Sequence, residues 1–426
     1  MKKWTIGCLL FFFAIVFCTG CSQTEKSTAT TATQSATARL KSNRIGASFT
    51  ISHAMWLNGS WGGPRGDGEA VGPPWQESLK AEADSGVSTV RLSHPWDLVE
   101  PEQGKFNWKE LDEAITICEQ AGVEIVLCIG VKSPRYPEYH PPGWIKAEVE
   151  KRLKPKPTDE LKIAIPDQLK KQIDELQQLV KKDPNDKALL DQLEEVNEQL
   201  NMVMAATPKA RDAIKRYLTA AVIRYRDRAS IKVWQVENEP LTFTRPMALS
   251  QVKEEIELVR SLDSKKRPIL VTTWTAVDVP PEWSAGWTTA VEQIIPLGDI
   301  VGFDCYIKSH EWETQEGHWQ LVKQWMASAR KQGKKVWITE WQAEPWEEGQ
   351  KMDFKDPYGN KSFNPKLYED TFQLALRLKP DKILLWGEEF QIACKKQGNS
   401  AWRVATAHLF FDVLDPNWRY PPQERD

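Results

Sequence analysis

The sequence predicts an α/β fold, a (β/α)8 barrel (TIM barrel) with an inserted αα-hairpin after its third strand. Strand-like and helix-like stretches alternate along the chain, which favours a parallel sheet with crossover helices. The alternation yields eight candidate strands, the number that closes naturally into a barrel. The stretch from about residue 41 to 426 is too long for a small domain and suits one barrel with insertions.

Short apolar stretches define the expected strands, at 44–49, 89–92, 124–129, 231–236, 269–273, 300–303, 336–339 and 383–386. The expected helices lie between them, at 74–85, 108–120, 209–226, 249–261, 288–295, 319–332, 367–378 and 401–411. Gly86, Gly122 and Gly333 follow three of these helices, where a glycine commonly ends a helix.

One segment, about residues 146–206, departs from the alternation. Apolar residues repeat there at helical spacing on both sides of a predicted turn at 183–186, first Leu169, Ile173, Leu176 and Val180, then Leu190, Leu193, Val196, Leu200 and Val203. This pattern predicts an amphipathic αα-hairpin. Because loops after barrel strands lie on the catalytic face, the hairpin is a solvated decoration, a lid or an oligomer contact.

The first forty residues predict export. Lys2 and Lys3 precede an apolar stretch at 8–17 that is too short to span a bilayer, which is typical of a signal peptide, here residues 1–20. Thr19-Gly20-Cys21 resembles the lipobox of bacterial lipoproteins, and the resemblance implies a lipid on Cys21; a plain signal peptide is the alternative. Residues 21–40 are rich in Ser, Thr and Ala and predict a flexible tether. The barrel domain, 41–426, would then be exported and held on the bacterial cell envelope, outside the cytoplasm.

Composition narrows the class of ligand. A formal net charge of −3 without a basic stripe makes nucleic acid an unsuitable partner. Four cysteines follow Cys21, and none has metal-ligand spacing, so no metal is expected: Cys118, Cys128, Cys305 and Cys394. Cys118 and Cys128 lie in apolar helix and strand patterns, which favours buried free thiols, and a disulfide in an oxidising compartment is the alternative. Twenty tryptophans provide flat aromatic faces, on which sugar rings stack.

Two expected strands end in carboxylates, where barrel enzymes place their chemistry. The fourth strand ends in residues 234–240, Trp-Gln-Val-Glu-Asn-Glu-Pro, and the seventh in residues 337–341, Trp-Ile-Thr-Glu-Trp. Cleavage of a glycosidic bond needs one carboxylic acid to protonate the leaving oxygen and one carboxylate across the anomeric carbon. Glu237 and Glu239 share strand parity, so alternation does not choose between them.

Asn238-Glu239-Pro240 after strand four and Glu340 after strand seven resemble the signatures of clan A glycoside hydrolases. That clan includes cellulases, β-mannanases, xylanases and β-galactosidases. The resemblance covers residues 44–415, selects Glu239 over Glu237, and implies that Glu239 is the general acid/base. It implies that Glu340 is the nucleophile, which forms a glycosyl-enzyme intermediate.

The resemblance also implies further roles. Asn238 would bind the sugar 2-hydroxyl, Tyr306 would hold Glu340, and Arg91 would keep Glu340 ionised. Trp386 would form the floor under the sugar. Two more tryptophans are expected among the substrate-binding side chains, Trp96 and Trp341. No metal or organic cofactor is implied. Strand six reads Asp304-Cys305-Tyr306, where family 5 of the clan has His-x-Tyr, which leaves the family and the sugar open.

The sequence therefore predicts a retaining glycoside hydrolase that cleaves β-linked oligo- or polysaccharides. Two alternatives remain: a catalytically silent glycan-binding barrel on the cell surface, and a transglycosylase that uses the same intermediate. Three further carboxylates near strand ends are either rim groups that bind sugar hydroxyls or solvated side chains: Glu344, Glu388 and Glu389. The sequence does not indicate an oligomeric state.

Overall fold

A computed structural model describes residues 43–60, 70–135, 137–145, 147, 167–183, 186–242, 246–276, 284–307, 316–347 and 352–414. Residue contacts divide the chain into two units, 1–41 and 42–426, and the second contains the barrel. The predicted signal peptide, the tether and Cys21 lie outside the described residues.

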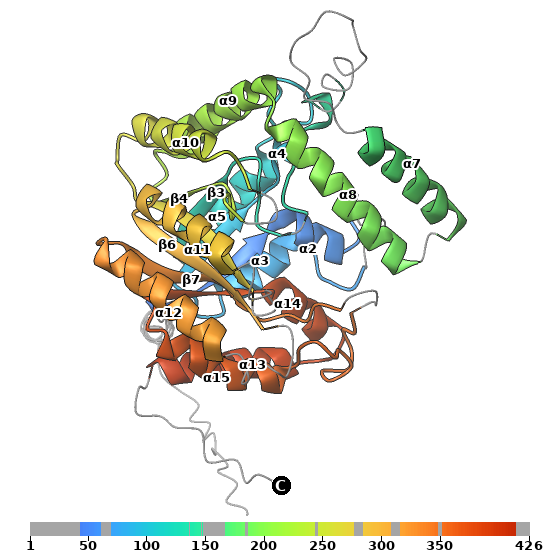
Figure 1. The fold of residues 1–426 in the computed structure, drawn as a ribbon. Helices are drawn as coiled ribbons and strands as arrows, with labels where there is room; N and C mark the ends of the chain where they lie inside the picture. The colour runs from blue at the N-terminus through green and yellow to red at the C-terminus, as the bar shows by residue number, and fades with distance from the viewer. Residues whose placement is uncertain are drawn as a thin grey trace, which may run out of the picture. The chain divides into compact units, whose positions relative to one another are not determined.

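Eight parallel strands close into a barrel in sequence order, which confirms the predicted fold class (Figure 1). The strands are β1 (Ile45–Thr50), β2 (Thr89–Ser93), β3 (Glu124–Ile129), β4 (Ile231–Val236), β5 (Ile269–Ala276), β6 (Ile300–Tyr306), β7 (Lys335–Gln342) and β8 (Lys382–Trp386). Each of the eight predicted strands is confirmed. The structure extends β5, β6 and β7 beyond the prediction at their carboxyl ends, where polar side chains alternate with apolar ones.

The eight predicted helices are also present: α3 (Trp75–Ala83), α5 (Lys109–Ala121), α9 (Pro208–Tyr225), α10 (Leu249–Leu262), α11 (Ser284–Ile294), α12 (Glu316–Lys331), α13 (Pro365–Arg377) and α15 (Ala401–Leu414). The prediction omitted three short helices that follow strands closely: α2 (Ile51–Leu57), α4 (Trp96–Val99) and α14 (Glu388–Lys396). It also omitted the 3-10 turn η2 (Ile295–Leu297), which continues α11. No helix in the described part of the chain is long and apolar enough to cross a bilayer.

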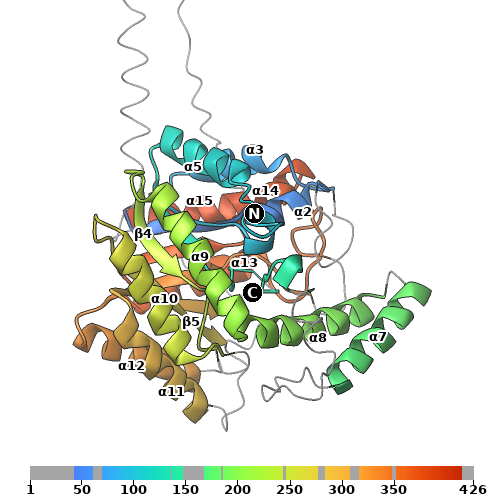
Figure 2. The ribbon, with the colours of Figure 1, turned by 90° about the horizontal axis from the view of Figure 1, so that it is seen from above.

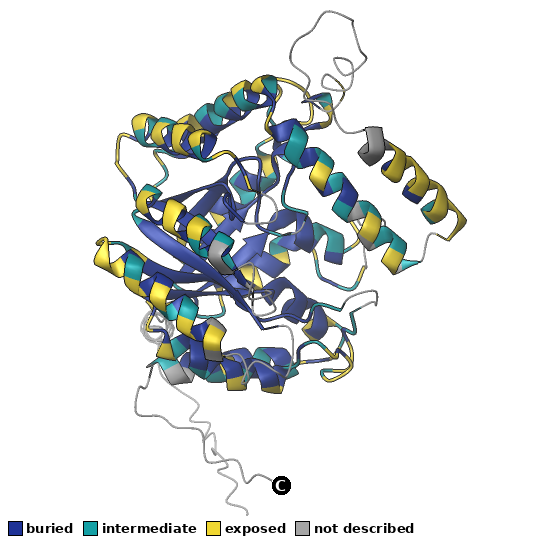
Figure 3. Cartoon of the chain, viewed as in Figure 1, coloured by how far each residue is buried: buried dark blue, intermediate teal, exposed yellow. Residues whose placement is uncertain are grey.

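The core has two parts. The larger part lies between the strands and the surrounding helices. The smaller part is a separate cluster of six strand side chains inside the barrel: Val126, Val233, Leu270, Ile300, Trp337 and Leu384. Figure 3 shows buried strands inside helices whose outer faces are exposed. Cys118 and Cys128 are buried free thiols, the favoured interpretation, and so are Cys305 and Cys394.

The inserted hairpin consists of α7 (Asp167–Lys182) and α8 (Lys187–Ala205), which lie side by side next to the barrel (Figures 1 and 2). Ile173 and Leu176 of α7 pack against Val196 of α8 in a small cluster of their own. The side chain of Asp186 caps α8 by accepting a hydrogen bond from the amide of Leu189 at 3.1 Å. Of the predicted insertion, residues 146, 148–166, 184 and 185 lie outside the described part.

Candidate active site

The backbone turns sharply after the end of β4 and gives Glu237 and Glu239 different surroundings, a difference that strand alternation could not predict. Glu237 and Glu239 have φ values of 61° and 40°, a left-handed backbone that non-glycine residues rarely adopt. The carboxylate of Glu237 accepts hydrogen bonds from the amides of Val131 at 2.9 Å and Lys132 at 2.6 Å. A Cβ on Gly130 would lie 2.3 Å from that carboxyl group, so this position requires a glycine. Glu237 therefore binds the loop after β3, whereas the carboxyl group of Glu239 lies with those of Asp304 and Glu340.

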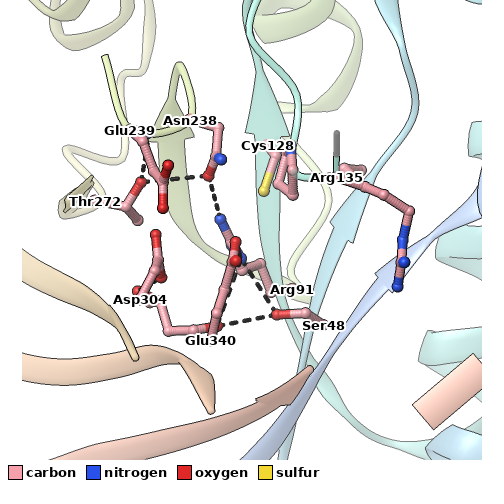
Figure 4. Close-up of polar contacts among 12 residues, drawn as sticks. Ser48, Arg91, Cys128, Arg135, Asn238, Glu239, Thr272, Asp304 and Glu340 are labelled. Atoms are coloured by element: carbon pink, nitrogen blue, oxygen red, sulfur yellow. Dashed lines mark hydrogen bonds and ion pairs between the residues drawn. The ribbon is translucent and has the colours of Figure 1, made fainter. Parts of the chain in front are cut away.

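Arg91 on β2 connects the predicted site residues across the barrel (Figure 4). Its guanidinium donates to Glu340 Oε1 at 2.5 Å, to Asn238 Oδ1 at 2.5 Å and to Gln235 Oε1 at 2.7 Å. The hydroxyl of Tyr306 donates to Glu340 Oε2. The predicted group of Arg91, Asn238, Tyr306 and Glu340 is thus brought together as one hydrogen-bonded set.

Three carboxylates face one another at the centre of the site. Glu239, Asp304 and Glu340 each place an oxygen within 4.8 Å of the other two, and their exposed fractions are only 6%, 0% and 2%. Figure 4 shows an oxygen of Asp304 directed toward Glu239. Among the described residues this is the one group spaced to hold a metal ion. Because Arg91 and Tyr306 already donate to both oxygens of Glu340, the trio suits shared protons better than a cation.

Buried carboxylates this close cannot all be ionised. Burial, followed by the charges of Glu138, Asp304 and Glu340, raises the pKa of Glu239. Burial and the charge of Asp304 also raise the pKa of Glu340, but the guanidinium of Arg91 lowers it. Glu340 gains most from being ionised, because only it has both the cation and the tyrosine hydroxyl as donors. The donors to Glu340 therefore favour Glu239 over Glu340 as the protonated member of this pair.

Asp304 is a site residue that the sequence prediction did not include. It pairs in register with Glu340 on the neighbouring strand, and its Oδ1 accepts a hydrogen bond from Thr339 Oγ1 at 2.6 Å. Strand alternation could have indicated Asp304 from the sequence, because Asp304 and Tyr306 are two residues apart on β6 and so point to the same face.

Asp304→Asn should move the whole pH profile of kcat/KM to lower pH. Loss of the charge removes one cause that raises the pKa of Glu239, so the basic limb moves down. The same loss lowers the pKa of Glu340, so the acidic limb moves down too. Profiles of the variant and of Asp84→Asn, an exposed control, measure the shift. An unmoved profile would mean that Asp304 is itself protonated.

The tryptophans divide between site and core. Trp386 lies at the end of β8, and the guanidinium of Arg135 covers one face of its ring, 4.7 Å from the centroid. Arg135 in turn donates to both oxygens of Glu344, at 2.8 and 3.2 Å. Trp346 packs against Tyr306, with ring centroids 4.3 Å apart and ring planes tilted by 34°, so it adds a second aromatic surface beside Glu340.

Two predicted substrate-binding residues are wrong. Trp96 and Trp341 are both 0% exposed. Trp96 stacks on Tyr217 of α9, and Trp341 packs against Trp319 and Phe372 on the helix side of β7. Trp341 points away from the barrel mouth, since the adjacent Glu340 points inward and successive strand residues point to opposite faces. Trp96 lies in α4, where its indole nitrogen donates to Glu100 at 2.7 Å and its ring is covered by Tyr217.

The three further carboxylates are buried rather than solvated, with exposed fractions of 0 to 1%. Glu344 pairs with Arg135, and Glu388, in α14, pairs with Arg403 at 2.8 Å. Glu389, also in α14, accepts a hydrogen bond from the amide of Thr50 at 2.8 Å. Only Glu344 and Glu389 lie near Trp386, through Arg135.

Comparison with known proteins gives matches among glycosidases. Residues 72–157 match the glycoside hydrolase 42 family model, described as beta-galactosidase. The beta-galactosidase Bga of Halorubrum lacusprofundi is 36% identical over 75 residues, 17% of this chain and 10% of that protein. A beta-galactosidase of Thermus thermophilus is 36% identical over 74 residues, 16% of this chain and 12% of that protein. The chain thus matches only about a tenth of the length of these relatives. The family-model match at 72–157 includes Arg91 but neither Glu239 nor Glu340.

Solved structures show similarity of fold over most of the chain. The cold-adapted beta-galactosidase of Rahnella sp. R3 has a TM-score of 0.53 at 11% identity, with 88% of this chain and 57% of that chain covered. A point variant of GH5_18 of Streptomyces cattleya, in complex with Manβ1-4GlcNAc, has a TM-score of 0.52 at 12% identity, with 89% of this chain and 82% of that chain covered. Both lie within the group of glycosidase barrels that the strand-end motifs resemble.

Proposed function

We propose that the chain is a retaining glycoside hydrolase that cleaves β-linked glycans through a covalent glycosyl-enzyme intermediate. The observation that carries the proposal is the spacing of Glu239 and Glu340, which bring carboxylate oxygens within 4.8 Å of each other. Retaining enzymes hold their two carboxyl groups about 5–5.5 Å apart, whereas inverting enzymes leave about 6.5–9.5 Å for a water molecule.

In the first step Glu340 attacks the anomeric carbon while Glu239 gives its proton to the leaving glycosidic oxygen. Arg91 and Tyr306 hold Glu340 ionised and oriented for this attack. Formation of the ester removes the negative charge of Glu340, which is one of the causes that raise the pKa of Glu239. Glu239 then takes a proton from water, and the resulting attack on the anomeric carbon releases the sugar with retained configuration.

Asn238 is the residue proposed to form a hydrogen bond with the sugar 2-hydroxyl. Its Oδ1 accepts from Arg91 and its Nδ2 donates to Glu138, and the second hydrogen of Nδ2 is the proposed donor to the sugar. The floor of the reacting subsite is Trp386. A β-galactoside is the first substrate to test, because the sequence relatives are named for that activity.

A panel of aryl β-glycosides (galactoside, glucoside, mannoside and xyloside) tests the function. At least one should be hydrolysed, and Glu239→Gln should lower kcat/KM by about 10²- to 10⁴-fold, the usual contribution of a general acid. Products longer than the substrate would instead indicate transglycosylation. Binding of glycans without turnover of any member of a wider polysaccharide panel would favour a silent binding barrel and contradict the proposal.

We further propose that the protein is exported and anchored by a lipid on Cys21, which follows the lipobox-like Thr19-Gly20. In cells grown with a labelled fatty acid, the wild-type chain should carry label and partition into the membrane fraction. Cys21→Ala should lose the label, while Cys118→Ala, a change at a buried thiol, should keep it. Labelling that survives Cys21→Ala would contradict the anchor.

A further inference from the structure

We propose that helix α8 of the inserted hairpin positions Asn238 for substrate recognition, by holding the loop that carries Glu138. The inference rests on the proposed function, since it concerns how the same site recognises its sugar. It assigns a role to an insertion that the sequence left open between decoration, lid and oligomer contact.

The first step links α8 to the loop that follows β3. The carboxylate of Glu198 is 0% exposed and accepts hydrogen bonds from the amides of Glu138 at 2.9 Å and Tyr139 at 3.1 Å. The side-chain amide of Asn201, one turn later on α8, donates to the carbonyl of Tyr139 at 3.0 Å. The amide and the carbonyl of Tyr139 are therefore both bound by one helix.

The second step links that loop to the site. Glu138 accepts a hydrogen bond from Asn238 Nδ2 at 2.9 Å and pairs with Lys132 at 2.7 Å. Lys132 also donates to the backbone carbonyl of Glu239 at 2.9 Å. Glu138 thus contacts the residue next to the general acid, and through Lys132 it acts on the backbone of the acid itself.

The third step concerns the amide of Asn238. Arg91 donates a hydrogen bond to its Oδ1, and Glu138 accepts one of the two Nδ2 hydrogens. These two contacts fix the orientation of the amide and therefore the direction of the second Nδ2 hydrogen. Glu138 and α8 are positioning elements, since neither needs to touch the sugar. If the loop moves, the free hydrogen loses its direction and the contact to the 2-hydroxyl weakens.

The burial of Glu198 supports a specific role for α8. Burial, followed by the charge of Glu138, raises the pKa of Glu198 to about 7. A buried carboxylate is costly unless donors compensate, and the two backbone amides of the loop supply them. A hairpin that only decorated the surface would have no need of a buried acid at this contact.

The test compares an aryl β-glycoside with its 2-deoxy analogue. Glu198→Ala and, independently, Asn201→Ala should lower kcat/KM for the 2-hydroxy substrate about threefold to tenfold more than for the 2-deoxy substrate, as loss of an oriented hydrogen bond predicts. Glu198→Gln, which keeps one acceptor, should recover part of the difference. Glu175→Ala, at an exposed glutamate of α7, should leave the ratio unchanged. Equal losses on both substrates, or no loss, would overturn the proposal.

Hydrogen–deuterium exchange tests the same link without catalysis. Glu198→Ala should speed exchange at the amides of Glu138 and Tyr139, while Glu175→Ala should not. If the wild type cleaves no glycoside, the proposed function is wrong, but the exchange measurement still tests whether α8 holds the loop that carries Glu138. Unchanged exchange at these two amides in a folded Glu198→Ala protein overturns it.

Discussion

Glu340→Ala should lower the turnover of an aryl β-glycoside on the order of 10⁴- to 10⁶-fold, the scale seen when a covalent nucleophile is removed. The side chain is buried within 4.8 Å of Glu239 and held by Arg91 and Tyr306. Its loss removes the atom that bonds to the anomeric carbon and leaves a small space on that face of the sugar. Added azide should enter the space and restore part of the rate.

The product identifies the role. With Glu340→Ala and azide we expect a glycosyl azide of inverted configuration, seen by NMR, because azide attacks from the face that Glu340 occupied. Glu344→Ala, at a nearby buried glutamate that pairs with Arg135, is the matched control and should yield no glycosyl azide. Nearly full activity in Glu340→Ala would contradict the assignment of the nucleophile.

Arg91→Met should be the most damaging substitution for stability within the site. The guanidinium is 1% exposed and bridges β2 to Glu340, Asn238 and Gln235, so its removal leaves a buried carboxylate without its cation. Removing one partner of a buried pair costs about 3–5 kcal/mol. Urea unfolding at pH 7 measures the loss, and Arg228→Met, which breaks a half-exposed pair with Glu119, should cost at most about 1 kcal/mol.

The pH dependence of that loss follows from Glu340. Its pKa, already raised by burial and by Asp304, rises further without Arg91. A carboxyl group whose folded pKa is raised above its unfolded value destabilises the protein as pH rises through the folded pKa. Arg91→Met should therefore lose more stability at pH 7 than at pH 5, and Arg91→Met/Glu340→Gln should recover part of it. A pH-independent loss without recovery would argue against an ionised Glu340.

The barrel was predictable because its strands are short, apolar and separated by amphipathic helices. All eight strands and the eight connecting helices were confirmed. Helices α2, α4 and α14 were not predicted, because each begins at or just after a strand end and at least half of its side chains are buried. Without an exposed face, such a helix lacks the periodic pattern that marks the others.

The clustering of the candidate site residues was predictable where strand-end position and motif agreed, as for Glu239, Glu340, Arg91, Asn238 and Tyr306. Strand alternation would have excluded Trp341, since it follows the inward Glu340. Alternation would also have included Asp304, two residues before Tyr306. It could not separate Glu237 from Glu239, because the strand ends at Val236 and a left-handed backbone re-aims both side chains.

The central claim is double displacement by Glu239 and Glu340, and the stereochemistry of the first product tests it most directly. Hydrolysis of an active aryl β-glycoside, followed by proton NMR before mutarotation is complete, identifies the anomer that is released. The spacing of the two carboxylates predicts the β-anomer, which would show retention. Release of the α-anomer would show inversion and contradict the account.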